Sequence, residues 1–442
     1  MQIVDGAMDT LIEQNVMEQS GEAQRARKSR RFVVLAWLGL LIAWAVVVYL
    51  NNTFRRPVSD HYSYLAAAML HGRLYLDGFP PAITDWVYYQ GRSYVPFGPF
   101  PVLIEMPFVA LFGLNLHTMT FSFPLTVLSG RLLWRIFAHL GVAVATRWWL
   151  LLLFFFGSVY SFVIIGEGPW FLAHVATVTL LLAALLLAVR KPLAALGRGE
   201  WLAIGLLVGA AFLSRSTAAL GALFFVVLLL ATGRRERWTR AAYLWPMAML
   251  GAGLGVALLL FCAYNYARFG NILATGYQWA YLSNPQLNQA ISYGLFSPSH
   301  IPTNFYYMFL AGFNPYPAPA AIMLQFPWFV PSPLGTSILL TTPALVYALR
   351  PRWNNPLVVA CWAAIIPTML ALLCYYAPGQ IQFGYRYTLD FMPFVMVLLA
   401  LAFREGISRL ARALIVAGVC VCLWGNISIG LALYDWCKCV SP

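Results

Sequence analysis

Residues 55–108 read RRPVSDHYSYLAAAMLHGRLYLDGFPPAITDWVYYQGRSYVPFGPFPVLIEMPF, a polar and aromatic stretch inside a chain that is otherwise largely apolar. The stretch separates two apolar runs, each suited to cross a membrane. A few residues would be enough to join two such helices, whereas this connection takes about fifty. Long ordered loops often carry function. The sequence therefore predicts a membrane protein organised around this first loop.

Local patterns predict the structure within the loop. Ser59 is a suitable N-cap and Gly72 a suitable terminator, and the apolar residues between them recur at helical spacing. This pattern predicts a short amphipathic helix on the membrane surface. WVYY and RSYV flank Gln90-Gly91, which predicts a small β-hairpin. The apolar run 102–114 is short for a span and predicts a re-entrant or surface helix.

Composition defines the fold class. Hydrophobic residues make up 61% of the 442 residues and charged residues 10%, which is typical of an all-α polytopic membrane protein. The 16 Trp and 23 Tyr are suited to interfacial belts. The net charge of +13 comes from short basic clusters between apolar runs. This distribution favours membrane topology and argues against nucleic-acid binding.

The apolar runs predict about eleven transmembrane helices. A cytoplasmic N-terminal tail, 1–31, precedes a single transmembrane domain, 32–442, with outer loops at 51–117 and 265–333. The expected spans are 32–50, 118–138, 148–165, 170–189, 201–213, 217–232, 242–264, 335–349, 357–376, 391–403 and 411–433.

The charge distribution predicts the orientation. The cluster RARKSRR at 25–31 precedes the first span, so this end is expected in the cytoplasm. With eleven spans, twenty of the 28 Lys and Arg fall on the inner side. Most carboxylates beyond the acidic tail fall on the outer side, and we expect the active site there. The expected location is a bacterial cell membrane.

Carboxylates and arginines on the outer side are the candidate functional residues. Asp60 opens the predicted surface helix, and Glu167 lies in a short Gly-flanked loop. Arg215 lies between two apolar runs, where a charge is costly without a partner. Arg386 and Asp390 stand four residues apart, which predicts an ion pair on one helical face. This set is suited to a substrate that carries a phosphate and a hydroxyl that must lose its proton.

Three motifs resemble the polytopic GT-C glycosyltransferases, a class that includes the protein O-mannosyltransferases and the aminoarabinose transferases of lipid A. The run PFGPFPVLIEMPFVALFG is similar to the segment before their second span. FLSRSTAAL is similar to the turn between their fifth and sixth spans, and FGYRYTLDFMPF to their late outer loop. The early Asp60 in a long first loop completes the resemblance. His61 follows it where the protein mannosyltransferases tend to carry a second acid.

The resemblance implies a mechanism and roles for individual residues. The donor would be a sugar on a polyprenyl phosphate, and the acceptor a lipid, glycan or protein hydroxyl. Asp60 would act as the base in a displacement with inversion, and Arg386 and Arg215 would bind the donor phosphate. No metal or other cofactor is required, although clustered carboxylates are compatible with a divalent metal. The remaining candidates would orient substrate: Glu105, Glu167, Asp85 and His61.

Each assignment has a structural alternative. Asp60 also suits the first turn of a helix, and Arg386 also suits a purely structural pair with Asp390. Asp85 also suits a turn, and His61 a hydrogen-bonded structural role. For the whole chain, one alternative is a non-catalytic subunit that packs against other membrane proteins. The other is a transporter of lipid-linked material, which would require charges in the middle of its spans.

Overall fold

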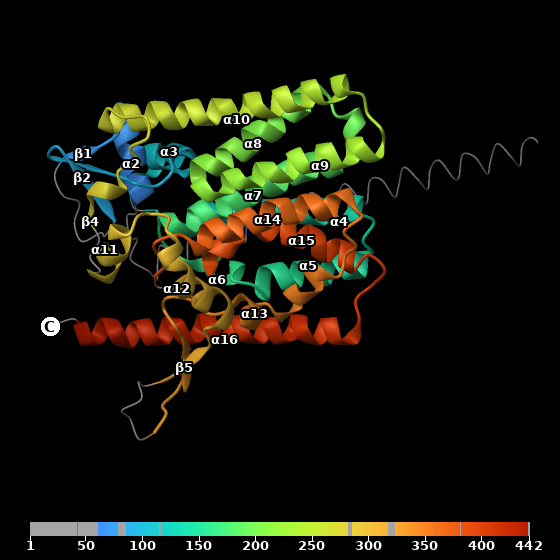
Figure 1. Ribbon diagram of the computed structural model, residues 1–442. Helices are drawn as coiled ribbons and strands as arrows, with labels where there is room; N and C mark the ends of the chain where they lie inside the picture. Colours follow the sequence, from blue (N-terminus) through green and yellow to red (C-terminus); the bar gives the residue numbers. More distant parts are fainter. Residues whose placement is uncertain are drawn as a thin grey trace, which may run out of the picture. The chain divides into compact units, whose positions relative to one another are not determined.

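Long apolar helices form most of the protein in the computed structural model (Figure 1). The described residues are 42, 61–77, 85–114, 116–281, 285–316, 323–380 and 382–440. Apart from residue 42, they belong to one compact unit that runs from Val58 to Pro442. The predicted tail 1–31 and the first span 32–50 lie outside the described residues, except for residue 42.

The α-helices follow the apolar runs of the sequence. They are α2 (His61–Leu70), α3 (Phe100–Phe112), α4 (Met119–His139), α5 (Val144–Phe156), α6 (Tyr160–Ile165), α7 (Pro169–Val189), α8 (Arg198–Ser214), α9 (Ala222–Arg235), α10 (Arg240–Phe269), α11 (Pro285–Ser292), α12 (Ile301–Phe305), α13 (Ile338–Thr341), α14 (Pro356–Leu373), α15 (Met392–Ala402) and α16 (Arg409–Val440). Short 3-10 helices include η2 (Ser216–Gly221), η6 (Pro343–Leu349) and η7 (Arg386–Asp390).

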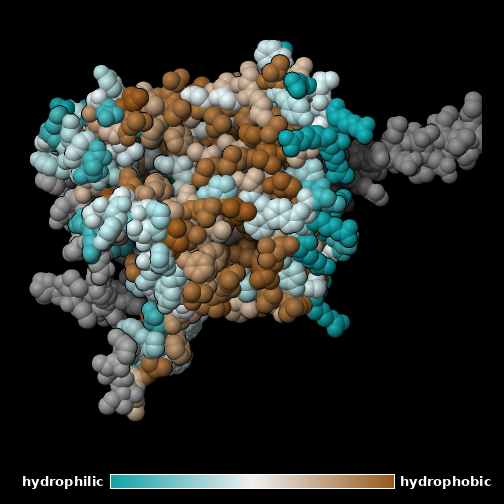
Figure 2. Space-filling model, viewed as in Figure 1, coloured by the Kyte–Doolittle hydropathy of each residue, from teal (hydrophilic) through white to brown (hydrophobic). Residues whose placement is uncertain are grey.

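Five described helical segments are long and apolar enough to cross a membrane. They are Pro169–Val189, Ser216–Arg235, Arg240–Phe269, Pro356–Leu373 and Arg409–Leu431. The helices α3, α5 and α15 are apolar but shorter. An apolar belt crosses the middle of the visible face of the unit, and hydrophilic residues lie on both sides of this belt (Figure 2). The protein is therefore an integral membrane protein, whereas the number of eleven spans is not confirmed.

Two of the expected spans are not continuous helices. The run 148–165 divides into α5 and α6 at Gly157, where the Ser158 hydroxyl donates to the Phe154 carbonyl. The run 335–349 consists of α13 and η6, which meet at Pro343. Proline lacks an N–H and cannot continue the hydrogen bonding of the preceding turn. Gly157 and Pro343 thus interrupt two segments that the hydropathy pattern alone predicts as single continuous helices.

The packed helices leave their polar connections at two opposite ends of the bundle (Figure 1). The connections after α7, α9 and α15 contain arginines and lie together at one end. The helix α2 and a small sheet lie at the other, which we call the sheet end. Gly205 of α8 and Gly253 of α10 face each other, so these two helices approach closely.

A four-stranded antiparallel sheet joins two distant parts of the chain at the sheet end. Its strands are β1 (Leu76–Asp77), β2 (Trp86–Tyr89), β3 (Arg92–Tyr94) and β4 (Ala280–Tyr281), in the order β1-β3-β2-β4. Gln90 and Gly91 have φ values of 49° and 74°, as the tight turn of the predicted hairpin requires. The hairpin and a helix, α2, occur where the sequence predicts them in the first loop. Six of the ten residues of α2 are buried, so the predicted amphipathic helix on the membrane surface is not confirmed. The pairing of β2 with β4 adds a contact to the second long segment.

A second hairpin, β5 (Phe313–Pro315) with β6 (Phe329–Pro331), extends from the side of the bundle beside α16 (Figure 1). Trp328 stacks on Trp424 of α16, with ring centroids 6.2 Å apart and planes 12° apart.

Candidate functional site

A polar cavity of about 260 Å³ lies at the sheet end, where the first loop meets the second long segment and η7. Four charged residues line it: Asp85, Glu167, Arg215 and Arg386. Seven large aromatic residues also line it: Phe97, Trp170, Phe171, Tyr277, Tyr375, Tyr376 and Tyr387. The cavity thus brings together four of the predicted site residues from segments about three hundred positions apart along the chain.

Arg386 opens η7 and is 5% exposed. Its Nη1 donates to the Gln380 carbonyl at 2.9 Å. Its guanidinium carbon lies 5.4 Å from the ring centroids of both Phe171 and Tyr387. Within the described part of the chain, Nε has no hydrogen-bond partner and no ion pair involves this guanidinium. Burial lowers the pKa of Arg386 and the charge of Arg215 adds to this effect, whereas Tyr387 and the Asp85 carboxyl oppose it.

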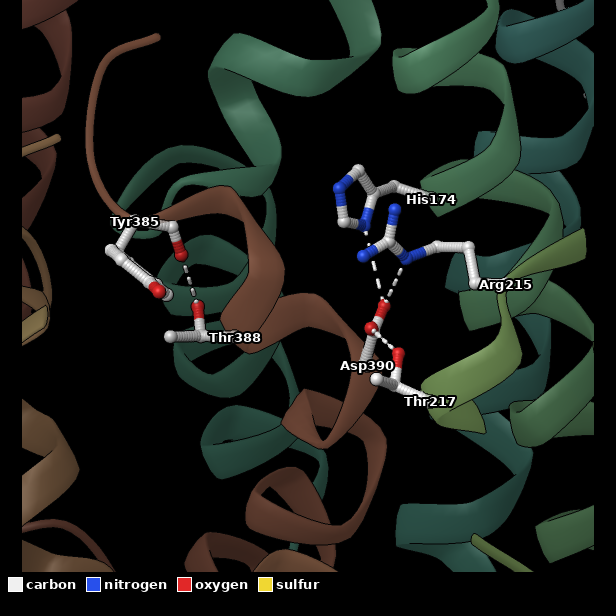
Figure 3. A network of polar contacts seen from close by, with 6 residues as sticks. All are labelled: His174, Arg215, Thr217, Tyr385, Thr388 and Asp390. Atoms are coloured by element: carbon white, nitrogen blue, oxygen red, sulfur yellow. Dashed lines mark hydrogen bonds and ion pairs between the residues drawn. The ribbon is translucent and has the colours of Figure 1, made fainter. Parts of the chain in front are cut away.

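Asp390 pairs with Arg215, and this finding corrects the expected pair with Arg386. Arg215 Nε donates to Asp390 Oδ1 at 2.6 Å, and Thr217 donates to the other carboxylate oxygen (Figure 3). His174 Nδ1 lies 3.4 Å from Asp390 Oδ1. Because η7 is a 3-10 helix, residues four apart do not share one of its faces. The predicted i, i+4 pairing is therefore wrong.

The two arginines of the cavity consequently differ in their electrostatics. Burial alone would raise the pKa of the Asp390 carboxyl, but Arg215 and His174 hold that pKa below its usual value. Arg215 is thus neutralised by a carboxylate that joins α7, η2 and η7. Arg386 carries a positive charge with no such partner in the described residues. An anion entering the cavity would meet, at Arg386, a guanidinium that no described carboxylate contacts as an ion pair.

Asp85 immediately precedes β2 and lines the cavity. Its φ of 69° is in the left-handed region, which an Asp tolerates better than most residues. Burial raises the pKa of its carboxyl, while Arg386 and Trp170 oppose that rise. The turn predicted for Asp85 and the site role predicted for it are therefore compatible in the structure.

Glu167 is held in place by the segment before α4. Its Oε2 accepts a hydrogen bond from the backbone N–H of Thr118 at 2.8 Å, and Thr118 Oγ1 accepts one from the N–H of Gly168. His117 Nδ1 lies 3.4 Å from the other carboxylate oxygen. This reciprocal clamp fixes a carboxylate that lines the cavity.

His61 and Glu105 lie outside the cavity lining. Asp60 lies outside the described residues, so its role as the base stays a prediction. His61 is buried in an aromatic cluster, stacked on Trp86 at 4.6 Å between centroids. Glu105 is fully buried in α3 and accepts a hydrogen bond from Ser63 Oγ of α2 at 2.8 Å. Glu105 therefore links the helices α2 and α3 and does not line the polar cavity.

A second cavity, of about 160 Å³, adjoins the polar cavity and contains a residue that the sequence patterns did not single out. We call it the Arg268 cavity, after a buried arginine near the end of α10 that lines it. The two cavities share six lining residues: Pro96, Phe97, Trp170, Arg215, Tyr277 and Tyr375. The available signal was a lone arginine at the end of an apolar run, which sequence alone cannot distinguish from a residue that reaches the headgroups.

An apolar groove of about 680 Å³ adjoins the Arg268 cavity in turn. Side chains of α3, α7, α8 and α10 line it, and the groove shares Pro99 and Tyr264 with the Arg268 cavity. Leu103, Leu206 and Leu260 are 41–56% exposed along it. A chain of adjoining spaces therefore runs from an apolar, outward-facing groove to the charged cavity.

Within the described residues, no group of three His, Cys, Asp or Glu side chains is placed to hold a metal ion.

Comparison with known proteins identifies the fold. No protein-family profile and no curated protein matches the sequence. The structure aligns with the oligosaccharyltransferase of Archaeoglobus fulgidus in its apo form, with a TM-score of 0.50, 14% identity, and coverage of 89% of this chain and 56% of that one. It also aligns with ArnT from Cupriavidus metallidurans bound to undecaprenyl phosphate, with a TM-score of 0.46, 15% identity, and coverage of 92% of this chain and 64% of that one.

Both of these structures are GT-C glycosyltransferases, and this chain spans 56–64% of their length. The likeness to the oligosaccharyltransferase shows that the fold is GT-C-like. The protein is thus an integral membrane protein with a GT-C-like fold.

Proposed function

We propose that the protein transfers a sugar from a polyprenyl-phosphate donor to an acceptor hydroxyl in the polar cavity. The acceptor oxygen attacks the anomeric carbon, and the bond from that carbon to the phosphate oxygen breaks with inversion. The hydroxyl proton passes to a carboxylate, and polyprenyl phosphate leaves with the electron pair of the broken bond. Because the phosphate is a good leaving group, the reaction needs one base and an anion-binding residue.

The observation that carries this proposal is the buried charge of Arg386, which no carboxylate of the described residues contacts as an ion pair, although Asp85 lines the same cavity. A buried guanidinium without a carboxylate partner is unfavourable unless a ligand supplies the anion. A phosphate can accept two parallel hydrogen bonds from a guanidinium, and Nε is without a described partner. The phosphate gains negative charge as the sugar leaves, so this contact strengthens in the transition state.

The other residues of the cavity suit a sugar ring. Aromatic faces such as Trp170 and Tyr376 provide flat apolar surfaces. Asp85 and Glu167 can accept hydrogen bonds from sugar or acceptor hydroxyls. Asp60, the residue before α2, remains the proposed base. We now assign Arg215 to positioning η7 through Asp390, rather than to binding phosphate.

The groove and the cavities favour this function over a purely structural role. A non-catalytic subunit on the same scaffold has no need for a charged cavity near an apolar groove that can hold the chains of a lipid substrate. Here two carboxylates line the polar cavity, and the apolar groove adjoins it through the Arg268 cavity. A transporter would need charges midway along its spans, whereas Asp85, Glu167 and Arg386 line one cavity together with Ala280 of the strand β4.

The experiment uses the full chain in proteoliposomes and a panel of polyprenyl-phosphate hexoses and pentoses. The measured product is free polyprenyl phosphate, which every such donor releases. Arg386→Lys should lower turnover more than donor affinity, because an ammonium cannot form the paired contact. Arg92→Lys is the matched control, since Arg92 is an exposed arginine that stacks on Tyr75 at the same end. Full turnover in Arg386→Lys would refute the assignment.

A further inference from the structure

Arg268 lies in the last turn of α10, which Gly270 terminates with a φ of 69°. It is 5% exposed and lines the Arg268 cavity. Its Nη1 donates to the Val95 carbonyl at 2.7 Å and its Nη2 to Asn265 Oδ1 at 2.7 Å, with a longer contact of 3.4 Å from Nε to the Tyr264 carbonyl. These bonds use three of its N–H groups and leave two for a ligand.

The charge of Arg268 is not compensated within the part of the chain that the structure describes. All its described hydrogen-bond acceptors are neutral, and no ion pair involves it there. Its nearest aromatic contact is the Tyr264 ring, 3.8 Å from the guanidinium carbon. A buried charge in this state is costly, and a bound anion would relieve the cost.

A second, independent observation points to a ligand at the same place. Tyr264 is 8% exposed, and its hydroxyl has no hydrogen-bond partner among the described residues. Tyr264 lines both the Arg268 cavity and the apolar groove. A buried donor without a partner thus marks the junction of the two spaces, directly beside the uncompensated guanidinium.

The groove indicates what carries the anion. Its lining is almost entirely aliphatic and aromatic, and no charged side chain lines it. The exposed leucines along it belong to helices of the apolar belt, so the groove faces lipid chains. A molecule with its chains in the groove would place its headgroup at Tyr264 and Arg268. This arrangement is complementary to an anionic lipid.

The anion site at Arg268 is separate from that at Arg386. Arg215 lies on the wall that the two cavities share, and its charge is neutralised by Asp390. Two uncompensated arginines therefore stand on either side of a neutral ion pair. One donor phosphate can satisfy one of these guanidinium groups, which leaves the other for a second anion.

We propose that the Arg268 cavity and the apolar groove bind an anionic lipid at the same time as the donor occupies the Arg386 cavity. This inference rests on the proposed function, in which such a lipid is the acceptor. Its headgroup lies against the shared wall of Arg215, Tyr277 and Tyr375, next to the cavity that receives the sugar. The acceptor class is then a lipid with a phosphate or other anionic headgroup.

The test is lipid binding to the purified full chain by native mass spectrometry. The probes are undecaprenyl phosphate, dioleoyl phosphatidic acid, dioleoyl phosphatidylcholine and inorganic phosphate. With undecaprenyl phosphate saturating, we expect one phosphatidic acid to bind in addition, and neither phosphatidylcholine nor inorganic phosphate to replace it. Arg268→Gln should weaken phosphatidic acid binding by about 10- to 100-fold, as the loss of a charge-assisted contact does. It should leave undecaprenyl phosphate binding unchanged.

Asn265→Asp provides a second variant that keeps Arg268 in place. The new carboxylate would stand at the position of Asn265 Oδ1, 2.7 Å from Arg268 Nη2, and supply an internal counter-ion. The variant keeps the hydrogen bond from Arg268 to Val95 but loses the one that Asn265 Nδ2 donates to the Ile272 carbonyl. Its thermal midpoint is therefore measured as well, and loss of phosphatidic acid binding at an unchanged midpoint reports charge rather than misfolding. Arg92→Gln is the control and should bind both lipids.

Three results would overturn the proposal. Strict competition between the two lipids would show that Arg268 and Arg386 serve one ligand. Normal phosphatidic acid binding by Arg268→Gln and Asn265→Asp would place that lipid elsewhere, and displacement by inorganic phosphate would exclude a role for the groove. Failure of the proposed function would give a different pattern. Arg386→Gln would then bind undecaprenyl phosphate normally, which refutes the donor site, while Arg268→Gln and Asn265→Asp would still lose phosphatidic acid binding, which supports the lipid site at Arg268.

Discussion

Arg386 and Arg215 should respond to neutral substitution with opposite signs of stability change. Arg386→Met removes a buried charge that has no ionic partner in the described structure, together with one hydrogen bond to the Gln380 carbonyl. The desolvation of a buried ion costs several kcal/mol, whereas a hydrogen bond from a charged group contributes about 1.5–3 kcal/mol. The net change should lie between zero and about 3 kcal/mol in the stabilising direction.

Arg215→Met should have the opposite effect. It leaves the Asp390 carboxylate, which is 1% exposed, without its cationic partner. Removing one partner of a buried pair costs about 3–5 kcal/mol. The double variant Arg215→Met with Asp390→Leu removes both charges and should recover most of that loss, with the Thr217 contact to Asp390 as the remaining cost.

The assay heats the detergent-solubilised full chain to a series of temperatures. Size-exclusion chromatography then measures the fraction that remains monodisperse, and the midpoint is the temperature at which half of this fraction is lost. The expected order of midpoint temperatures is Arg386→Met at or above the wild type, then the double variant, then Arg215→Met. A large destabilisation by Arg386→Met would refute the reasoning, because it would mean that this guanidinium has a structural partner. A double variant as unstable as Arg215→Met would refute the assignment of the Arg215–Asp390 pair.

The remaining predictions concern the carboxylates and the topology. Burial raises the pKa of the Asp85 carboxyl, so the folded protein loses stability as the pH rises from the ordinary pKa of 3.8 through the raised pKa. Between pH 4 and 7, the thermal midpoint should therefore fall less for Asp85→Asn than for the wild type. Parallel curves of midpoint against pH would contradict this. Asp60→Asn should lower transfer about 10²–10⁴-fold while donor binding survives, and near-normal transfer would remove Asp60 as the base. A cysteine introduced at 234–240 should resist labelling from outside intact cells, and ready labelling there would reverse the predicted orientation.

Local patterns predicted the local elements of the first loop. The turn at Gln90-Gly91 and the helix from His61 to Leu70 depend on nearby residues, and both are present, although the helix is mostly buried and does not show the predicted amphipathic surface. The pairing of β2 with β4 joins residues almost two hundred positions apart. No short pattern could reveal that contact, which closes the polar cavity around Asp85.

The arginines show why the site was only partly predictable. The spacing of Arg386 and Asp390 suggested a helical pair, but the true partner of Asp390 is Arg215, 175 positions away. Hydropathy placed Arg268 at the end of a span and gave no sign that it is buried without a carboxylate. Glu105 and Glu167 looked alike in sequence, whereas packing made one a link between helices and left the other in the cavity lining.

The most direct test of the central claim is the binding of radiolabelled undecaprenyl phosphate to the purified protein, because this lipid phosphate is common to donors that differ in their sugar. We predict saturable binding at one equivalent, weakened at least about 10-fold by Arg386→Gln and retained when Arg215 and Asp390 are replaced together. Equal binding by the wild type and Arg386→Gln would contradict the assignment of the polar cavity as the donor site.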